Sequence, residues 1–254
     1  MVLTVSDRIA GLTAGLGLDR PGSPPTGEQL LAGVLLDELS GDALDLGRVI
    51  GRWVALADRP FDCPVVARSL GELNRTGAPP AEGSFEPGLG ATLVTLAGAV
   101  RLFQTPRNLV SGVYHLARLL DPHPIGTFTA VAAAVAAGRL LEGYRDFVPA
   151  VLDVLLANQA PEPLIAAVRR APVWVRSPAL AGAPETELGT VFWALHHFGQ
   201  APEVLDALAP AGPLGRTIGR ALLGARLGPL GLAGQGDRTG GFEPTPNVVE
   251  GPDR

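Results

Sequence analysis

The sequence has no lysine and almost no cysteine. Its single cysteine, Cys63, excludes an intrachain disulfide and a metal site built from several thiolates. All 20 basic residues are arginine, against 25 acidic residues, and the formal net charge is −5. The longest basic run is the pair Arg169 and Arg170. Because nucleic-acid binding needs a clustered positive face, we expect no nucleic-acid partner.

Aromatic residues and long apolar runs are also scarce. Aromatic side chains make up 5% of the chain. The longest uninterrupted apolar run, residues 130–137, is far short of the roughly 18–20 residues that a membrane span requires. The first residues lack the positive and apolar regions of a secretory signal, because Ser6, Asp7 and Arg8 interrupt them. We therefore expect a cytoplasmic protein without a membrane span.

The sequence is rich instead in leucine, alanine and valine, and 46% of its residues are hydrophobic. Because alanine, leucine and arginine favour helices, this composition predicts an all-α protein. Apolar residues with helical spacing predict helices over about residues 9–18, 28–39, 44–58, 91–103, 105–120, 124–141, 144–159, 161–171, 186–198, 202–208 and 216–227. The short connections between them favour a compact orthogonal multi-helix bundle.

Two stretches lack helical signals. Residues 76–90 contain too much proline and glycine for regular structure and predict a long surface loop. Residues 230–254 have a similar composition and predict a disordered tail, which leaves one domain over residues 1–229. Each stretch carries isolated apolar residues, such as Phe85 and Phe242. We expect the tail to become ordered only against a partner or a neighbouring subunit.

Five short stretches rich in glycine, proline or small residues lie at or near the starts of predicted helices. They are RIAG at residues 8–11, PTGE at 25–28, GLGA at 88–91, PHP at 122–124 and PAGPLGRTIGR at 210–220. Their order resembles that of the ADP-ribosylglycohydrolase family, the all-α dinuclear-magnesium hydrolases that remove ADP-ribose from protein side chains. The resemblance is spread over most of residues 8–228.

The first predicted helix resembles the opening helix of the family. Arg8, Gly11 and Gly15 fit the family pattern R-I-x-G-x-x-x-G. The family helix ends in a Gly-Asp pair, and Asp19 lies within about one residue of that acid. The next family element is a Thr/Ser-Asp-Asp-Thr turn that binds both metals, where this chain has Thr26 but neither aspartate.

The later elements keep their glycines and lose their polar ligands. Leu89 replaces the asparagine of a Gly-Asn-Gly-Ala helix start, while His123 matches the histidine of a Thr-His-Pro start.

The last element, a Gly-Gly-Asp-x-Asp-Thr turn, is also altered. Gly212 and Thr217 match its ends, but Leu214 and Arg216 occupy the two aspartate positions. Magnesium prefers carboxylate and water oxygens, and two such ions close together need several negative charges. The resemblance therefore implies a retained fold whose magnesium site is lost, and we expect no metal and no other cofactor.

The resemblance leaves a small set of candidate site residues. Glu28 and Asp19 are the candidate catalytic acids, although Glu28 also fits an acid that stabilises a helix N-terminus beside a Thr26 cap. His123 fits either a cleft residue or a local structural element at a helix start. The candidates for lining the ligand cleft are Thr26, Gly88, Gly90, His123, Gly212, Arg216 and Thr217.

Two functions are compatible with these residues. The first is a catalytically degenerate protein that acts as a binding or assembly module, with an unknown protein partner or through self-association. The second is a divergent hydrolase of ADP-ribosyl or related N- or O-glycosidic bonds with a metal-poor cleft. In it, Glu28 and Asp19 would be the acid/base pair, and Arg216 would bind a phosphate.

Overall fold

The computed structural model describes residues 3–18, 24–40, 45–174 and 183–233. Within these ranges all the regular structure is helical, which confirms the predicted all-α class. The α-helices are α1 (Val5–Leu16), α2 (Gly27–Leu39), α3 (Leu46–Val54), α4 (Pro64–Thr76), α5 (Gly90–Leu102), α6 (Pro106–Leu120), α7 (Pro124–Leu141), α8 (Val148–Ala157), α9 (Glu162–Arg170), α10 (Pro184–His197), α11 (Ala201–Ala207) and α12 (Gly212–Ala233). Two single 3₁₀ turns, Ala171–Val173 and Ala209–Ala211, complete the regular structure.

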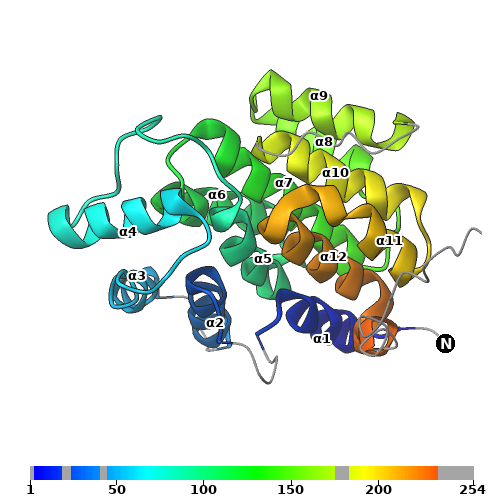
Figure 1. Ribbon diagram of the computed structural model, residues 1–254, viewed down its shortest axis with the longest axis horizontal. Helices are drawn as coiled ribbons and strands as arrows, with labels where there is room; N and C mark the ends of the chain where they lie inside the picture. The colour runs from blue at the N-terminus through cyan, green and yellow to red at the C-terminus, as the bar shows by residue number, and fades with distance from the viewer. Residues whose placement is uncertain (1–2, 19–23, 41–44, 175–182, 234–254) are drawn as a thin grey trace, which may run out of the picture.

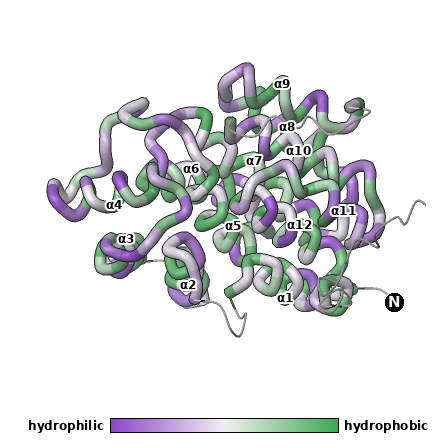
Figure 2. The backbone as a smooth tube through the Cα atoms, in the orientation of Figure 1, coloured by the Kyte–Doolittle hydropathy of each residue, from purple (hydrophilic) through white to green (hydrophobic). Residues whose placement is uncertain are grey.

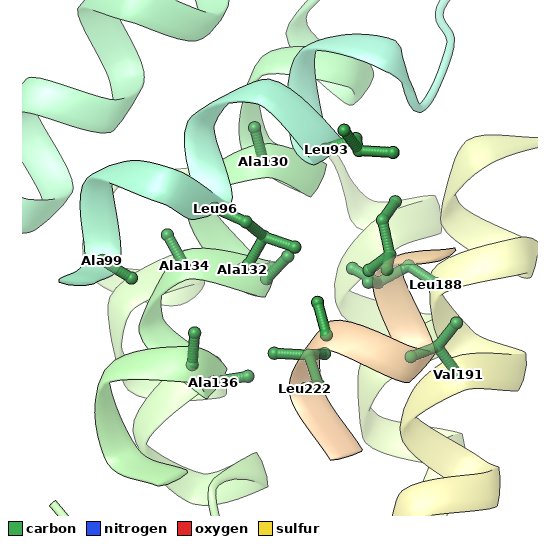
Figure 3. Close-up of a cluster of buried hydrophobic side chains, with 14 of the residues drawn as sticks. Leu93, Leu96, Ala99, Ala130, Ala132, Ala134, Ala136, Leu188, Val191 and Leu222 are labelled. Atoms are coloured by element: carbon green, nitrogen blue, oxygen red, sulfur yellow. The ribbon is translucent and has the colours of Figure 1, made fainter. Parts of the chain in front are cut away.

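Helices α5 and α7 lie in the middle of the bundle, with α1, α2, α6, α10 and α12 around them (Figure 1). Alanines of α7 share one buried cluster with Leu93 and Leu96 of α5, Leu188 of α10 and Leu222 of α12 (Figure 3). The outer helices α3 and α4 instead alternate hydrophilic and hydrophobic residues (Figure 2). Small side chains in α7 thus allow several helices to approach one another closely around a central core.

Helix α7 is long and apolar enough, by length and composition, to cross a membrane. Its 18 residues have a mean hydropathy of 1.4, but 78% of them are buried inside the bundle. Because its neighbours cover it on almost every side, α7 is the core helix of this fold.

Most predicted helices are present, and α7 has the predicted bounds, but α4 was not expected. Its sequence has a proline, Pro64, at the first helical position, while its N-cap residue Cys63 offers no capping side chain. The group that caps the start of α4 belongs to another helix, α2. Sequence periodicity alone therefore gave no boundary for α4.

The last helix begins and ends differently from the prediction. It starts at Gly212, four residues early, and continues through a kink at Gly228 (φ 72°) and Pro229 to Ala233. Residues 230–233, which we assigned to the tail, are therefore helical, and Leu232 is buried. The remainder of the predicted tail, residues 234–254, lies outside the described residues.

Helices α1 and α12 lie side by side and make the most extensive helix pair of the bundle (Figure 1). Gly11 and Gly224 face each other so closely that a β-carbon on either would overlap the backbone carbonyl of the other. A β-carbon on Gly15 would lie 2.5 Å from the α-carbon of Ala221. The glycine spacing of the first motif therefore serves close backbone packing between the two ends of the domain.

Candidate functional site

Thr26 and Glu28 lie at the start of α2 and have different structural roles. Thr26 is the N-cap: its hydroxyl accepts the Gln29 N–H at 3.4 Å, and the Gln29 side chain accepts the Thr26 N–H at 2.9 Å. This reciprocal arrangement is a capping box. The side-chain Nε2 of Gln29 also donates to the Leu16 carbonyl at 2.9 Å, and this bond connects α2 to the end of α1.

Glu28 is fully buried, and its carboxylate turns towards the start of α4. One oxygen accepts the Cys63 N–H at 2.7 Å, and the other accepts the Asp62 N–H at 3.2 Å. The carboxylate thus satisfies backbone donors at a helix N-terminus, where negative charge is favourable. It supplies from α2 the capping group that the α4 sequence lacks.

The thiol of Cys63 occupies space left by two glycines. A β-carbon on Gly88 would lie 2.6 Å from the Cys63 sulfur, and one on Gly90 would lie 2.6 Å from the Cys63 β-carbon. Burial, together with the nearby negative charge of Glu28, raises the pKa of the thiol. The thiol therefore stays protonated and serves packing, because a reactive cysteine needs a lowered pKa.

Asp121 joins the starts of α5 and α7, and it was not a sequence candidate. Its buried carboxylate accepts the Gly88 N–H at 2.9 Å and the His123 N–H at 3.0 Å. Gly126 leaves room for this carboxylate, since a β-carbon there would overlap it. Burial raises the pKa of Asp121 to about 6, against the opposing effect of the two hydrogen bonds. The available sequence signal was an acid two residues before His123 at a helix start.

His123 is the N-cap of α7, and its side chain closes the first turn. The ring Nδ1 accepts the Ile125 N–H at 3.1 Å, so the neutral ring carries its proton on Nε2. Histidine here has the same local role as a capping serine or asparagine. The sequence allowed His123 to be either a cleft residue or a local structural element, and these hydrogen bonds account for the structural role.

Four sequence candidates and two further residues form one continuous set of contacts, which we call the helix-start cluster. The candidates are Glu28, Gly88, Gly90 and His123, and the further residues are Cys63 and Asp121. It links the N-termini of α2, α4, α5 and α7. Both of its carboxylates point at backbone amides rather than at solvent.

The first turn of α12 contacts other elements. Gly212 has φ 66°, and the Thr217 hydroxyl donates to the Pro213 carbonyl at 3.1 Å. Gly212 packs beside Glu187 of α10, and Arg216 is exposed. In the described ranges no hydrogen bond or ion pair links this turn to the helix-start cluster. Asp19, the other candidate acid, lies outside the described residues.

Comparison with known proteins places the architecture. No family model matches the sequence, and no curated protein matches it. One solved structure, described as "ADP-ribosylglycohydrolase-related protein complex", covers 88% of this chain and 88% of its own, with a TM-score of 0.68 and 19% sequence identity. The chain has an ADP-ribosylglycohydrolase-like fold. This confirms the fold expected from the sequence, and at this identity the likeness carries no activity with it.

The acidic side chains of this ADP-ribosylglycohydrolase-like fold are scattered in the described part of the chain. There, no group of three or more histidine, cysteine, aspartate or glutamate residues lies close enough together to hold a metal ion. Glu28 and Asp121 are already bound to backbone donors.

The same fold carries an open apolar groove away from the helix-start cluster. It lies between α6 and α8 over α7, and we call it the α6–α8 groove. Its main hollow has a volume of about 670 Å³ and is lined by Val110, Tyr114, Phe128 and Val154. The rings of Tyr114 and Phe128 lie 5.5 Å apart. A second hollow of about 190 Å³ shares Pro106, Val110 and Val154 with the first, so the two are continuous.

Polar groups line only part of the groove. In the main hollow they are Arg107, Ser111, His115 and Asn158, and the guanidinium of Arg107 carries a permanent positive charge. In the smaller hollow Arg139 pairs with Glu142 at 2.6 Å, so their charges offset each other. The groove is therefore apolar with a basic edge.

Proposed function

We propose that this protein is a catalytically degenerate ADP-ribosylglycohydrolase-like protein that acts as a protein-interaction module. The observation that carries the proposal is the use of Glu28 and Asp121. Both carboxylates are buried at helix starts and accept backbone N–H groups from the residues just before α4, α5 and α7. Carboxyl groups with these bonds hold helix starts together, and releasing them for catalysis would leave buried amides without partners.

The α6–α8 groove is the surface that we assign to the partner. Two helices form its walls and a third its floor, which is the shape that accepts an amphipathic helix. Because Arg107 gives the groove a basic edge, we propose that the partner helix carries an acidic residue beside its apolar face. The similar solved structure is described as a protein complex, which supports an assembly role for this fold.

The alternative is a divergent hydrolase of ADP-ribosyl or related glycosidic bonds. It needs Glu28 as an acid or base, yet Glu28 is fully buried and both of its oxygens accept backbone N–H groups. To reach a substrate, it would have to release the start of α4. This cost favours the interaction module over the hydrolase.

Two groove variants test the interaction module in the native cell. Ser111→Arg places a bulky side chain in the groove from an exposed position, and Arg107→Glu reverses the charge of its edge. We expect each to weaken binding of a stoichiometric companion protein about tenfold or more. The matched control is Arg59→Glu, which makes the same charge change at an exposed position outside the groove. The measurement is the amount of companion that copurifies with each variant.

Two outcomes would contradict this assignment. In one, the same companion is recovered equally with the two groove variants and with Arg59→Glu. In the other, the purified chain alone is a dimer that Ser111→Arg converts to a monomer, so that the groove binds a second copy.

A further inference from the structure

Three arginines from three separate elements line one cavity on the side of the bundle where α1 meets α12. Its volume is about 340 Å³, and its walls include Arg8 of α1, Arg145 of the segment between α7 and α8, and Arg226 of α12. Tyr144 and Leu227 also line it. No residue of this cavity belongs to the helix-start cluster or to the α6–α8 groove.

Two of the three guanidinium groups are fixed in place by backbone carbonyls. Arg8 donates from Nη1 to the Leu140 carbonyl at 3.2 Å and to carbonyls of α12. Arg226 donates from Nη1 to the Leu195 carbonyl at 2.6 Å and from Nη2 to the Phe198 and Gly199 carbonyls at 2.9 and 3.1 Å, which leaves one Nη1 hydrogen and Nε–H for a ligand. Such positions need no reorganisation when a ligand binds.

The other edge of Arg8 borders the cavity. Gly143, a lining residue with φ 96°, lies beside it: a β-carbon built there would be 3.6 Å from Nη2 and 4.0 Å from Nε. All three hydrogen bonds of Arg8 to the described part of the chain leave from Nη1, so Nη2 and Nε have donors for a ligand there. Tyr144, stacked on the Arg139 guanidinium at 3.7 Å, forms a neighbouring wall.

Among the residues that the structure describes, no aspartate or glutamate lines this cavity, so the positive charges of its arginines are not balanced within the described lining. Burial and the positive charge of Arg145 both lower the pKa of Arg226. In a protein with a net charge of −5, this is a local concentration of positive charge that a bound anion would offset.

We propose that this cavity binds a small phosphate anion, either inorganic phosphate or the phosphoryl group of a small monoester. Its three guanidinium groups belong to three separate elements of the chain, so a bound anion would meet donors from more than one side. That arrangement suits a tetrahedral oxyanion, whereas a planar carboxylate is matched by one bidentate guanidinium. The volume of about 340 Å³ leaves room for the phosphoryl group and a small substituent.

The test is calorimetric titration of the full chain with inorganic phosphate and, separately, with phenyl phosphate, at constant ionic strength. We expect saturable binding at one site and a matching rise in Tm. Acetate, as the planar anion, is expected to produce neither effect. Tighter binding of phenyl phosphate would identify a monoester as the natural ligand, and equal or weaker binding would identify free phosphate.

Arg145→Gln is the decisive variant, because Arg145 is exposed and its replacement leaves the anchored arginines in place. We expect it to weaken phosphate binding about tenfold or more, as loss of a hydrogen bond to a charged group does. Arg59→Gln, with the same charge change elsewhere on the surface, should bind phosphate as the wild type does. Absence of saturable phosphate binding, or equal binding by the two variants, would overturn the proposal. Neither result depends on the interaction role of the groove.

Discussion

Replacing Gly11 with alanine should destabilise the folded protein by about 3 kcal/mol or more, the upper range for overpacking a core. The added methyl group would overlap the Gly224 carbonyl, and that atom belongs to the backbone of a packed helix that cannot turn aside. Gly224→Ala should have a similar effect, because its methyl group would overlap the Gly11 carbonyl. The measurement is the free energy of unfolding from urea denaturation.

The matched controls are glycines of other helices. Nothing lies within 4 Å of a β-carbon built on Gly33 of α2 or on Gly71 of α4. Alanine there should stabilise the protein by about 0.5–1 kcal/mol, the usual helix preference of alanine over glycine. If Gly11→Ala behaved like Gly33→Ala, the close crossing of α1 and α12 would be wrong.

The stability of the protein should fall as pH rises from about 4 to 6, through ionisation of Asp121. Its pKa of about 6 in the folded state lies above the ordinary 3.8, so the folded state binds more protons than the unfolded state in this window. Above pH 6, where Asp121 is ionised in both states, its ionisation lowers the free energy of unfolding by about 3 kcal/mol at most, at about 1.4 kcal/mol per pKa unit.

Asp121→Asn isolates this contribution, because asparagine keeps the size of the side chain and does not titrate. The difference in unfolding free energy between wild type and variant should change by up to about 3 kcal/mol between pH 4 and pH 7, with the wild type losing stability relative to the variant. Other titrating groups cancel in this difference. Parallel pH profiles for the two proteins would contradict the buried, ionisable position of Asp121.

The fold followed from the sequence because its signals are local or carried by glycine spacing. The apolar, alanine-rich run that begins at Pro124 located α7, because alanine and leucine favour helices and proline is common at the first helical position. Gly11 and Gly15 indicated the fold for another reason. Only glycine fits where the backbones of α1 and α12 meet, although the contacting residues of α12 lie some two hundred positions later in the sequence.

The helix-start cluster could be predicted only in part. The capping role of Thr26 is readable locally, as a threonine followed by Gln29. The bond from Glu28 to the backbone of Cys63 joins residues of two helices, and no local pattern reveals it. The same holds for Asp121, whose carboxylate meets Gly88 across 33 positions of sequence. Long-range capping therefore hid both the start of α4 and the role of Asp121.

Calorimetric titration of the purified chain with manganese tests the central claim, that the fold persists without the metal chemistry of the family it resembles. Manganese favours the same carboxylate and water oxygens as magnesium, so it reports on the same kind of site. We predict only weak, unsaturable heats. Binding of two manganese ions per chain at micromolar concentration would contradict the claim and restore the hydrolase as the leading function.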